Sequence, residues 1–345
     1  MKAAFIRQHG TIDQLDVGEL DIPKVGHNDV LVETKYGALN HLDIFVVAGW
    51  AGLSLRMPHI LGSDGAGIVK EVGSAVTKVK PGDSVTVNPG LSCNKCESCL
   101  SGQQNFCGEF SILGEHQWGT FAQFFKVPEV SVMKLPPKFP LDKAAAAPLT
   151  FLTAWRMLVT RARVQRGEIV FIHGAGGGVA TAAIQIAKYL GATVITTTST
   201  PEKAGKAKAL GADHVVNYKE MPDYGKVVYA DLTGRKGVDV VIDSVGARTF
   251  ADSVRLLRAG GRLVTCGATT GPTGQVDIRN IFWKQLEIYG STMSNQGEFR
   301  AVMKLVLSGV LSPVIDRVFP LAQAKDAEKY LTQANQFGKV LLEVK

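Results

Sequence analysis

Residues 168–200 read EIVFIHGAGGGVATAAIQIAKYLGATVITTTST, and this stretch decides the fold of the second part of the chain. An apolar run, EIVFIH, precedes a glycine cluster, a helical stretch, AAIQIAKYL, and a β-branched run, TVITTT. Strands that alternate with helices in this way form parallel βαβ units with helices on both faces of the sheet. The alternation continues through EKAGKAKAL, HVVNY, DVVID, RLVTC and LEIYG, and it predicts a doubly wound α/β sheet.

The glycine cluster lies between the first strand and the first helix of this pattern. Its spacing fits G-x-x-G-x-x-A, from Gly174 through Gly177 to Ala180, better than G-x-G-x-x-G. Glycines allow a tight turn here and let backbone N–H groups at the helix N-terminus approach a pyrophosphate. A flexible loop is the alternative, but the position between a strand and a helix favours a dinucleotide site.

The end of the next strand bears on which dinucleotide binds. An acidic side chain there would accept hydrogen bonds from the ribose hydroxyls of NAD and would repel a 2′-phosphate. This chain has hydroxyl side chains at residues 196–200, with Lys203 close behind. Hydroxyls and a cation can hold a phosphate, so the sequence favours NADP(H) over NAD(H). A β-branched strand end that lets both cofactors bind is the alternative.

The first third of the chain has a different pattern. Short strand-like runs (KAAFI, LDVGEL, DVLVETKYGALN, AGIVKEVG and DSVTV) alternate with turn signals such as PGD. We therefore expect a β-rich, barrel-like domain over residues 1–150 and a dinucleotide-binding domain over residues 151–292. A helix capped by Asn295 and a closing strand, GKVLLEVK, should return the chain to the first domain over residues 293–345.

Four cysteines, Cys93, Cys96, Cys99 and Cys107, have the spacing C-x2-C-x2-C-x7-C in a Gly-, Asn- and Ser-rich loop. Thiolates at this spacing can close a tetrahedron around Zn2+, and a four-thiolate site has no open position for chemistry. We expect one structural Zn2+ in a lobe over about residues 90–110. Two disulfides are the alternative, but C-x2-C pairing makes small strained rings.

Length and charge narrow the class of protein further. The 345 residues are enough for two domains with separate cores, and the formal net charge of +7 favours anionic ligands. The basic residues are dispersed, so we expect no nucleic-acid partner. No apolar run approaches the roughly 18 residues of a membrane span, and the start, MKAAFIRQHG, lacks a signal-peptide profile. We therefore expect a cytoplasmic protein with no membrane partner.

Nine segments carry a resemblance that covers essentially the whole chain: GALNHLD, PHILGSDGAGIVKEVG, PGDSV, the four cysteines, GTFAQF, HGAGGGVATAAIQIAK, GVDVVIDSVG, GGRLVTCG and FGKVLLEV. With these motifs, the chain resembles the medium-chain dehydrogenase/reductase superfamily, which includes zinc alcohol dehydrogenases and quinone reductases. The resemblance implies an α/β fold, with a GroES-like β-barrel catalytic domain and a Rossmann domain. It also implies hydride transfer.

Three positions depart from the zinc alcohol dehydrogenases that the chain resembles. Those enzymes hold a catalytic zinc with a cysteine, a histidine and a second cysteine or an acid, and the matching positions here are Asn40, Ser63 and Leu149. A neutral amide, a hydroxyl and an alkyl chain cannot hold Zn2+ with useful affinity. Asn40 and Asp43 match instead the N-x-x-D of zinc-free quinone and enone reductases. The resemblance thus implies a structural zinc beside a metal-free reaction centre.

Without a metal, hydrogen-bond donors must stabilise the oxygen that gains charge as hydride arrives. Candidates are the Asn40 amide, the Ser63 hydroxyl and the His116 imidazole, with Asp43 and Asp64 orienting the first two. Such donors polarise less than a metal, so delocalised acceptors are easier substrates than simple alcohols. We therefore predict an NADPH-dependent reductase of a bulky apolar ketone, an enone or a quinone.

The predicted cofactor-binding residues come from the glycine loop, the strand ends and the positions that contact the cofactor in the family. They are His41, Thr153, Gly174, Gly176, Gly177, Gly178, Val179, Thr198, Ser199, Lys203, Tyr218, Ser244, Val245, Cys266, Gly267, Ala268 and Ser291. We expect Cys266, which ends the apolar run RLVTC, to be buried and not a nucleophile. The resemblance also implies a homodimer or a homotetramer, formed through the strand near residues 286–290.

Two other interpretations stay open. A displaced metal site built from His41, His59, Asp64 and His116 would make the protein a zinc-dependent secondary alcohol dehydrogenase. No pair of these residues has the spacing that fixes two ligands on one element. The other interpretation is an NADPH-binding protein with a structural or regulatory role and little turnover.

Overall fold

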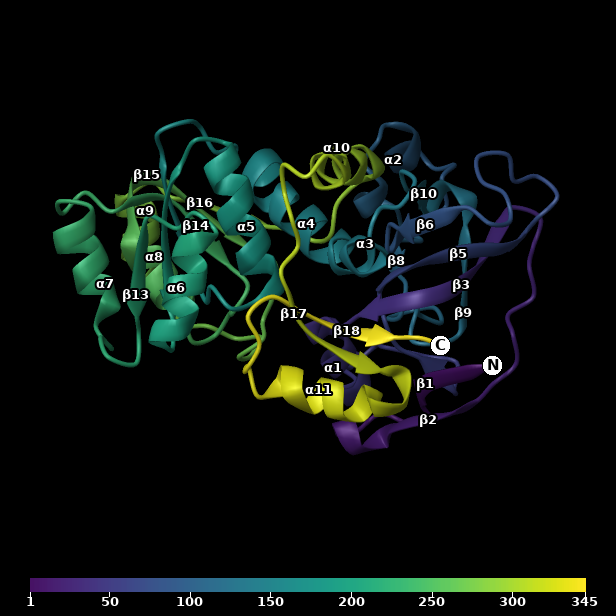
Figure 1. Cartoon of the computed structure of the whole chain (residues 1–345). Helices are drawn as coiled ribbons and strands as arrows, with labels where there is room; N and C mark the ends of the chain where they lie inside the picture. The colour runs from purple at the N-terminus through teal and green to yellow at the C-terminus, as the bar shows by residue number, and fades with distance from the viewer. The chain divides into compact units, whose positions relative to one another are not determined.

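The computed structural model describes residues 1–345, which form two compact units. The β-rich unit contains Met1–Thr150 and Ser294–Lys345, and the α/β unit contains Phe151–Met293 (Figure 1). The chain therefore leaves the first unit, forms the second and then returns. None of the helices combines the length and the apolar composition that crossing a membrane requires.

The β-rich unit contains two main sheets and one short strand pair. The three-stranded sheet has the order β2-β1-β4, with β1 Lys2–Ile6, β2 Leu15–Glu19 and β4 His59–Ile60. The larger sheet has the order β10-β6-β5-β3-β18-β17, and β9 also pairs with β3. Its strands are β3 Asp29–Ala38, β5 Asp64–Val72, β6 Ser84–Val87, β9 Phe124–Pro128, β10 Val132–Lys134, β17 Ile315–Pro320 and β18 Lys339–Glu343. The pair β7 Gly90–Leu91 and β8 Ser111–Ile112 flanks the cysteine segment.

The last strand of the chain, β18, lies beside β3 in the larger sheet (Figure 1). The two strands are antiparallel, with Leu341 opposite Ala38. The residues just before Leu341 therefore lie next to the residues just after Ala38. This register brings Lys339 to Asn40, which is 299 positions earlier in the sequence.

Helices cover the sheets of the β-rich unit. They are α1 His41–Ala48, α2 Glu97–Leu100, α3 Leu141–Ala146, α10 Gln296–Leu307 and α11 Ala324–Thr332. Asn295 and Glu298 form a capping box at the start of α10, which confirms the predicted cap. Apolar side chains of α1 and α11, such as Val46 and Leu331, pack in one core with Phe5 and Phe121. This packing fixes both helices against the first strands of the chain.

The α/β unit contains one six-stranded parallel sheet. Its strands are β11 Ile169–Ile172, β12 Thr193–Thr198, β13 His214–Asn217, β14 Val238–Asp243, β15 Leu257–Thr265 and β16 Glu287–Gly290. Its helices are α5 Gly178–Tyr189, α6 Pro201–Ala209, α7 Tyr224–Lys226, α8 Phe250–Leu256 and α9 Ile278–Trp283, and α4 Pro148–Trp155 crosses the boundary of the two units.

The order of this sheet is β13-β12-β11-β14-β15-β16, with every pair parallel. This result confirms the predicted doubly wound sheet. The strand order reverses between β11 and β14, and ligands of such sheets bind at the carboxyl ends of the strands at this reversal. The glycine loop follows β11 directly, at that edge.

Candidate active site and cofactor site

The start of α1 is fixed by the buried carboxylate of Asp43. One carboxylate oxygen accepts the backbone N–H of Asn40 at 2.7 Å, and the other accepts the N–H of Gly62 at 3.1 Å. Asp43 thus ties α1 to the turn between β4 and β5. Burial raises the pKa of Asp43 to about 7, although these N–H groups and the Lys339 ammonium oppose the shift.

A buried ammonium, that of Lys339, lies at the centre of the site. Its Nζ donates to the Leu39 carbonyl at 2.6 Å, to Asn40 Oδ1 at 2.6 Å and to Asp64 Oδ2 at 3.1 Å. Asn40 Nδ2 donates to the same Asp64 oxygen at 2.9 Å, and Asp64 Oδ1 accepts the N–H of Leu149 at 2.8 Å. We call Lys339, Asn40 and Asp64 the buried triad.

Lys339 was absent from the residues predicted from the sequence. A signal for it exists, because GKVLLEVK places one lysine in a strand whose other residues up to Leu342 are buried and apolar. A buried ammonium requires a carboxylate and further hydrogen bonds to offset its desolvation. The sequence alone does not show that Asp64 is this partner.

A third buried carboxyl group, that of Glu328 on α11, interacts with the charges of Asp43 and Lys339. It is fully buried, and neither of its carboxylate oxygens has a hydrogen-bond partner. Burial raises the pKa of Glu328 well above its ordinary value, the nearby charge of Asp43 raises it further, and Lys339 opposes the shift. Three buried acids therefore interact with the charge of one ammonium, and burial favours the protonated form of Glu328.

We predict that replacing Glu328 with the isosteric amide removes the destabilisation that the ionised carboxylate causes at high pH. Folding raises the pKa of Glu328, so the stability that its protonated form contributes is fully present at low pH. This contribution is lost as the pH rises through the folded-state pKa. Glu328→Gln should therefore be more stable than the wild type at pH 8, by about 1–3 kcal/mol, and nearly equal to it at pH 4. Denaturant unfolding at both values measures this difference.

Glu71 on β5 supplies a matched control, because its side chain is exposed at the surface and is not buried as that of Glu328 is. Glu71→Gln should leave the pH dependence of unfolding unchanged. Equal stability of Glu328→Gln and the wild type at pH 8 would show that Glu328 is ionised without cost.

Both polar atoms of the Asn40 side chain are engaged within the buried triad, and Nδ2 also lies 3.3 Å from the Ala38 carbonyl. Asn40 is therefore held in place. By contrast, the buried hydroxyl of Ser63 has no hydrogen-bond partner. An unpaired buried hydroxyl costs about 1–3 kcal/mol, so this group is available to a ligand. Its neighbours Gly62 and Asp64 are bonded into the site just described.

The structure does not bring His116 into the buried triad. Its Nδ1 accepts the N–H of Ile112 at 3.2 Å and lies 3.7 Å from Glu115, and its side chain is 43% exposed. His59 is buried, with Nε2 at 3.1 Å from the Gly114 carbonyl, and burial lowers its pKa. His41 begins α1, and burial together with Lys339 lowers its pKa. One ring nitrogen of His59, one of His116 and both carboxylate oxygens of Asp64 thus have partners other than a metal.

The four cysteines converge into one cluster. All four sulfurs lie within 4.8 Å of one another, with 3.9 Å between Cys93 and Cys99 and 3.5 Å between Cys107 and Cys93. Zinc–sulfur bonds of about 2.3 Å in a tetrahedron place sulfurs about 3.8 Å apart. The N–H groups of Cys96 and Glu109 point at two of the sulfurs, which favours thiolates. The cluster therefore fits a closed Zn2+ site.

The glycine loop has the geometry of an anion cradle. Gly174 has φ +68°, and a Cβ there would meet no atom within 4 Å, so the open side of the turn is free for a ligand. The loop continues through Gly176 to Gly177, the N-cap of α5, which begins with Gly178 and Val179. The N–H groups of this first turn have no acceptor within the helix, and they fit a pyrophosphate.

Several predicted cofactor residues follow the carboxyl ends of the strands. Thr198 ends β12, and Ser199 and Lys203 come after it; Tyr218 follows β13; Ser244 and Val245 follow β14; Cys266, Gly267 and Ala268 follow β15; Ser291 follows β16. The hydroxyls of Thr153, Thr198 and Ser291 are buried without a hydrogen-bond partner. Thr153 lies on α4, and the two orphaned hydroxyls at the strand ends, those of Thr198 and Ser291, fit a polar ligand. Cys266 lies one residue past the end of β15 and is partly exposed, so the expectation of a buried strand residue is wrong. Desolvation still raises the pKa of its thiol to about 12, as expected for a thiol that is no nucleophile.

Asp243, at the end of β14, has a structural role at this edge and was not among the residues predicted from the sequence. It accepts the N–H groups of Val245 and Gly246 and the hydroxyls of Thr249 and Ser253. These bonds shape the turn that carries Ser244 and Val245. The acid is the last residue of the apolar run DVVID, and that position is its signal in the sequence.

Comparisons with known proteins agree with this architecture. The family described as alcohol dehydrogenase GroES-like domain matches residues 26–137, and the zinc-binding dehydrogenase family matches residues 178–308. A zinc-type alcohol dehydrogenase-like protein of Schizosaccharomyces pombe is 32% identical over 96% of each chain. An acryloyl-coenzyme A reductase of Sulfurisphaera tokodaii is 31% identical over 94% of this chain and 95% of its own length.

Among solved structures, an NAD-dependent alcohol dehydrogenase superposes with a TM-score of 0.96, at 43% identity and full coverage of both chains. These matches confirm the GroES-like and Rossmann architecture that the motifs implied. The chain belongs to the medium-chain dehydrogenase/reductase superfamily, and it is an NAD(P)-dependent oxidoreductase.

Proposed function

We propose that this enzyme transfers hydride from NADPH to a bulky apolar ketone, an enone or a quinone, without a catalytic zinc. The observation that carries the proposal is the buried triad. At the three positions of the zinc ligands, the Asn40 amide is bonded to Lys339 and Asp64, Ser63 has a free hydroxyl, and Leu149 has an apolar side chain. None of these three side chains is a suitable ligand for Zn2+.

The proposed chemistry needs a hydride donor, and NADPH supplies the hydride when it is bound. The glycine loop and the first turn of α5 would hold its pyrophosphate, and Thr198, Ser199 and Lys203 would hold its 2′-phosphate. The closed cysteine site would hold a structural Zn2+ in the β-rich unit.

The residues of the β-rich unit act on the substrate oxygen. The Ser63 hydroxyl donates a hydrogen bond to this oxygen as it gains charge. Asp43 holds the neighbouring Gly62 N–H, and Asp64 of the buried triad, which follows Ser63, holds the Leu149 N–H. A donor such as the Ser63 hydroxyl contributes about 2–4 kcal/mol in a dry site. A single donor favours acceptors that spread the charge over a conjugated system. The acryloyl-coenzyme A reductase relative is named for such a conjugated substrate.

We predict that Ser63→Ala lowers kcat for an enone about a hundredfold, because the donor to the developing oxyanion is lost. Thr34→Val is the matched control, since the Thr34 hydroxyl is also buried and unpartnered but lies in the middle of β3. Both variants should keep or gain stability. Unchanged kcat in Ser63→Ala, from steady-state kinetics with NADPH and an enone, would remove Ser63 from the mechanism.

The preference for NADPH gives a separate prediction. Lys203→Ala should raise KM for NADPH about tenfold and leave KM for NADH unchanged, because only NADPH carries the phosphate that the cation contacts. Lys206→Ala, one turn later on α6, is the control and should change neither value. Equal KM values for the two cofactors in the wild-type enzyme would contradict the preference for NADPH. They would not contradict the proposal that the hydride acceptor is a ketone, an enone or a quinone.

A further inference from the structure

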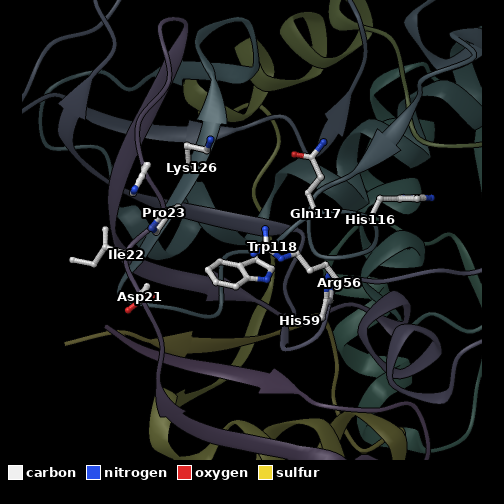
Figure 2. A pocket seen from close by; sticks show the side chains of 10 residues that line it. Asp21, Ile22, Pro23, Arg56, His59, His116, Gln117, Trp118 and Lys126 are labelled. Atoms are coloured by element: carbon white, nitrogen blue, oxygen red, sulfur yellow. The ribbon is translucent and has the colours of Figure 1, made fainter.

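A groove with a volume of about 540 Å³ lies wholly within the β-rich unit (Figure 2). Four segments line it: the one that follows β2 and carries Ile22 and Pro23, the one that runs from Arg56 into β4 at His59, the one from His116 to Trp118, and β9 with Lys126. The groove therefore shares no residue with the glycine loop or the buried triad, although His59 and His116 line it.

The groove is strongly cationic. Lys24, Arg56 and Lys126 line it, and Asp21 is the acid among the lining residues. Lys126 forms an ion pair with Asp29 at 2.8 Å. Lys24 and Arg56 are exposed and form no ion pair in the structure. Two cations without counter-ions in a concave surface attract an anion with more than one charge.

A rigid aromatic ring adds a second recognition element. The indole N–H of Trp118 donates to the Pro58 carbonyl at 2.9 Å, which fixes the ring, and the residue packs on the apolar core of the β-rich unit. Figure 2 shows this ring between Ile22 and Pro23 on one side and Arg56 and His59 on the other. A fixed indole at the wall of a cavity is a surface on which a planar base can stack.

We propose that the groove binds the nucleotide part of a phosphorylated ligand. The base stacks on Trp118, and the phosphates contact Lys24 and Arg56. This combination of a ring and cations matches a nucleoside phosphate better than it matches a purely apolar or a purely anionic ligand. The inference does not depend on the proposed hydride acceptor, because the groove and the buried triad share no residue.

Calorimetric titration tests the proposal, with adenosine 3′,5′-bisphosphate added to protein already loaded with NADP+. NADP+ is added only to one equivalent, which fills the dinucleotide site and leaves no excess to compete for the groove, so heat from the probe reports a second site. We expect one equivalent to bind, and at least tenfold weaker binding in Lys24→Ala/Arg56→Ala. The matched control is Arg300→Ala/Lys304→Ala, which removes the same two charges from the exposed face of α10 and should not change the affinity.

Three results would overturn the proposal: no second equivalent, equal affinity in the two double variants, or displacement of the probe by inorganic phosphate at equal concentration. The last result would show that the groove selects charge alone. Turnover of an enone by the wild-type enzyme, without the probe, tests the proposed function separately.

A free nucleotide and a substrate linked to a nucleotide share this chemistry. A free nucleotide acts as a regulator and changes the turnover of a phosphate-free enone when the probe is added. If the natural ligand is instead a substrate linked to a nucleotide, the probe competes with that substrate, and turnover of the phosphate-free enone stays constant when the probe is added. Either result supports a nucleotide site in the groove.

Discussion

Lys339→Met is expected to lower kcat about a hundredfold and to destabilise the protein by about 3–5 kcal/mol. The ammonium offsets the charge of Asp64 and holds the Asn40 amide, with hydrogen bonds of 3.1 Å and 2.6 Å. Methionine fills a similar volume but leaves a buried carboxylate without its partner. The segment that carries Ser63 then shifts, and displacements of about 1 Å in an active site cost on the order of a hundredfold in rate.

A double variant separates the two effects. Lys339→Met/Asp64→Asn has no unpaired charge, so most of the lost stability should return in denaturant unfolding. Turnover of an enone should stay low, because the triad that positions Ser63 is still broken. Recovery of kcat together with stability would show that Lys339 has a structural role only.

Cys107→Ser is expected to reduce the zinc content from about one ion per chain to almost none. A structural zinc site needs all four thiolates, and metal binding at such sites contributes directly to folding. The loop from Cys93 to Cys107 should then become the first site of proteolytic cleavage. Elemental analysis and limited proteolysis measure the two effects.

Cys266→Ser is the control for this experiment. Cys266 lies after β15 in the α/β unit, whereas the cysteine cluster belongs to the β-rich unit. Its substitution should leave the zinc content at one ion per chain. Full zinc occupancy in Cys107→Ser would show that the metal is held by other residues.

The features predicted correctly from the sequence have local causes. The doubly wound sheet follows from the alternation of strands and helices, and the cysteine cluster follows from ligands within 15 residues of one another. The capping box of Asn295 and Glu298 is equally local. Each of these patterns acts over one or two elements, so the order of residues is sufficient to identify it.

The buried triad could be predicted only in part. Asn40, Asp43, Ser63 and Asp64 stand out in two short motifs, but Lys339 reaches them only through the pairing of β18 with β3. Glu328 lies on the amphipathic helix α11, whose pattern does not show that this acid faces the core. The Asn40 amide was predicted as a donor to the substrate, and its engagement with Lys339 and Asp64 became visible only in three dimensions.

The central proposal is hydride transfer without a catalytic metal, and one measurement tests it most directly. Zinc per chain and NADPH-dependent turnover of an enone are measured together, before and after dialysis against a mild chelator. We predict one tightly held zinc and unchanged turnover, because the cysteine site is closed and the buried triad contains no zinc ligand set. Two zinc ions, with turnover lost as the weaker one is removed, would contradict the proposal.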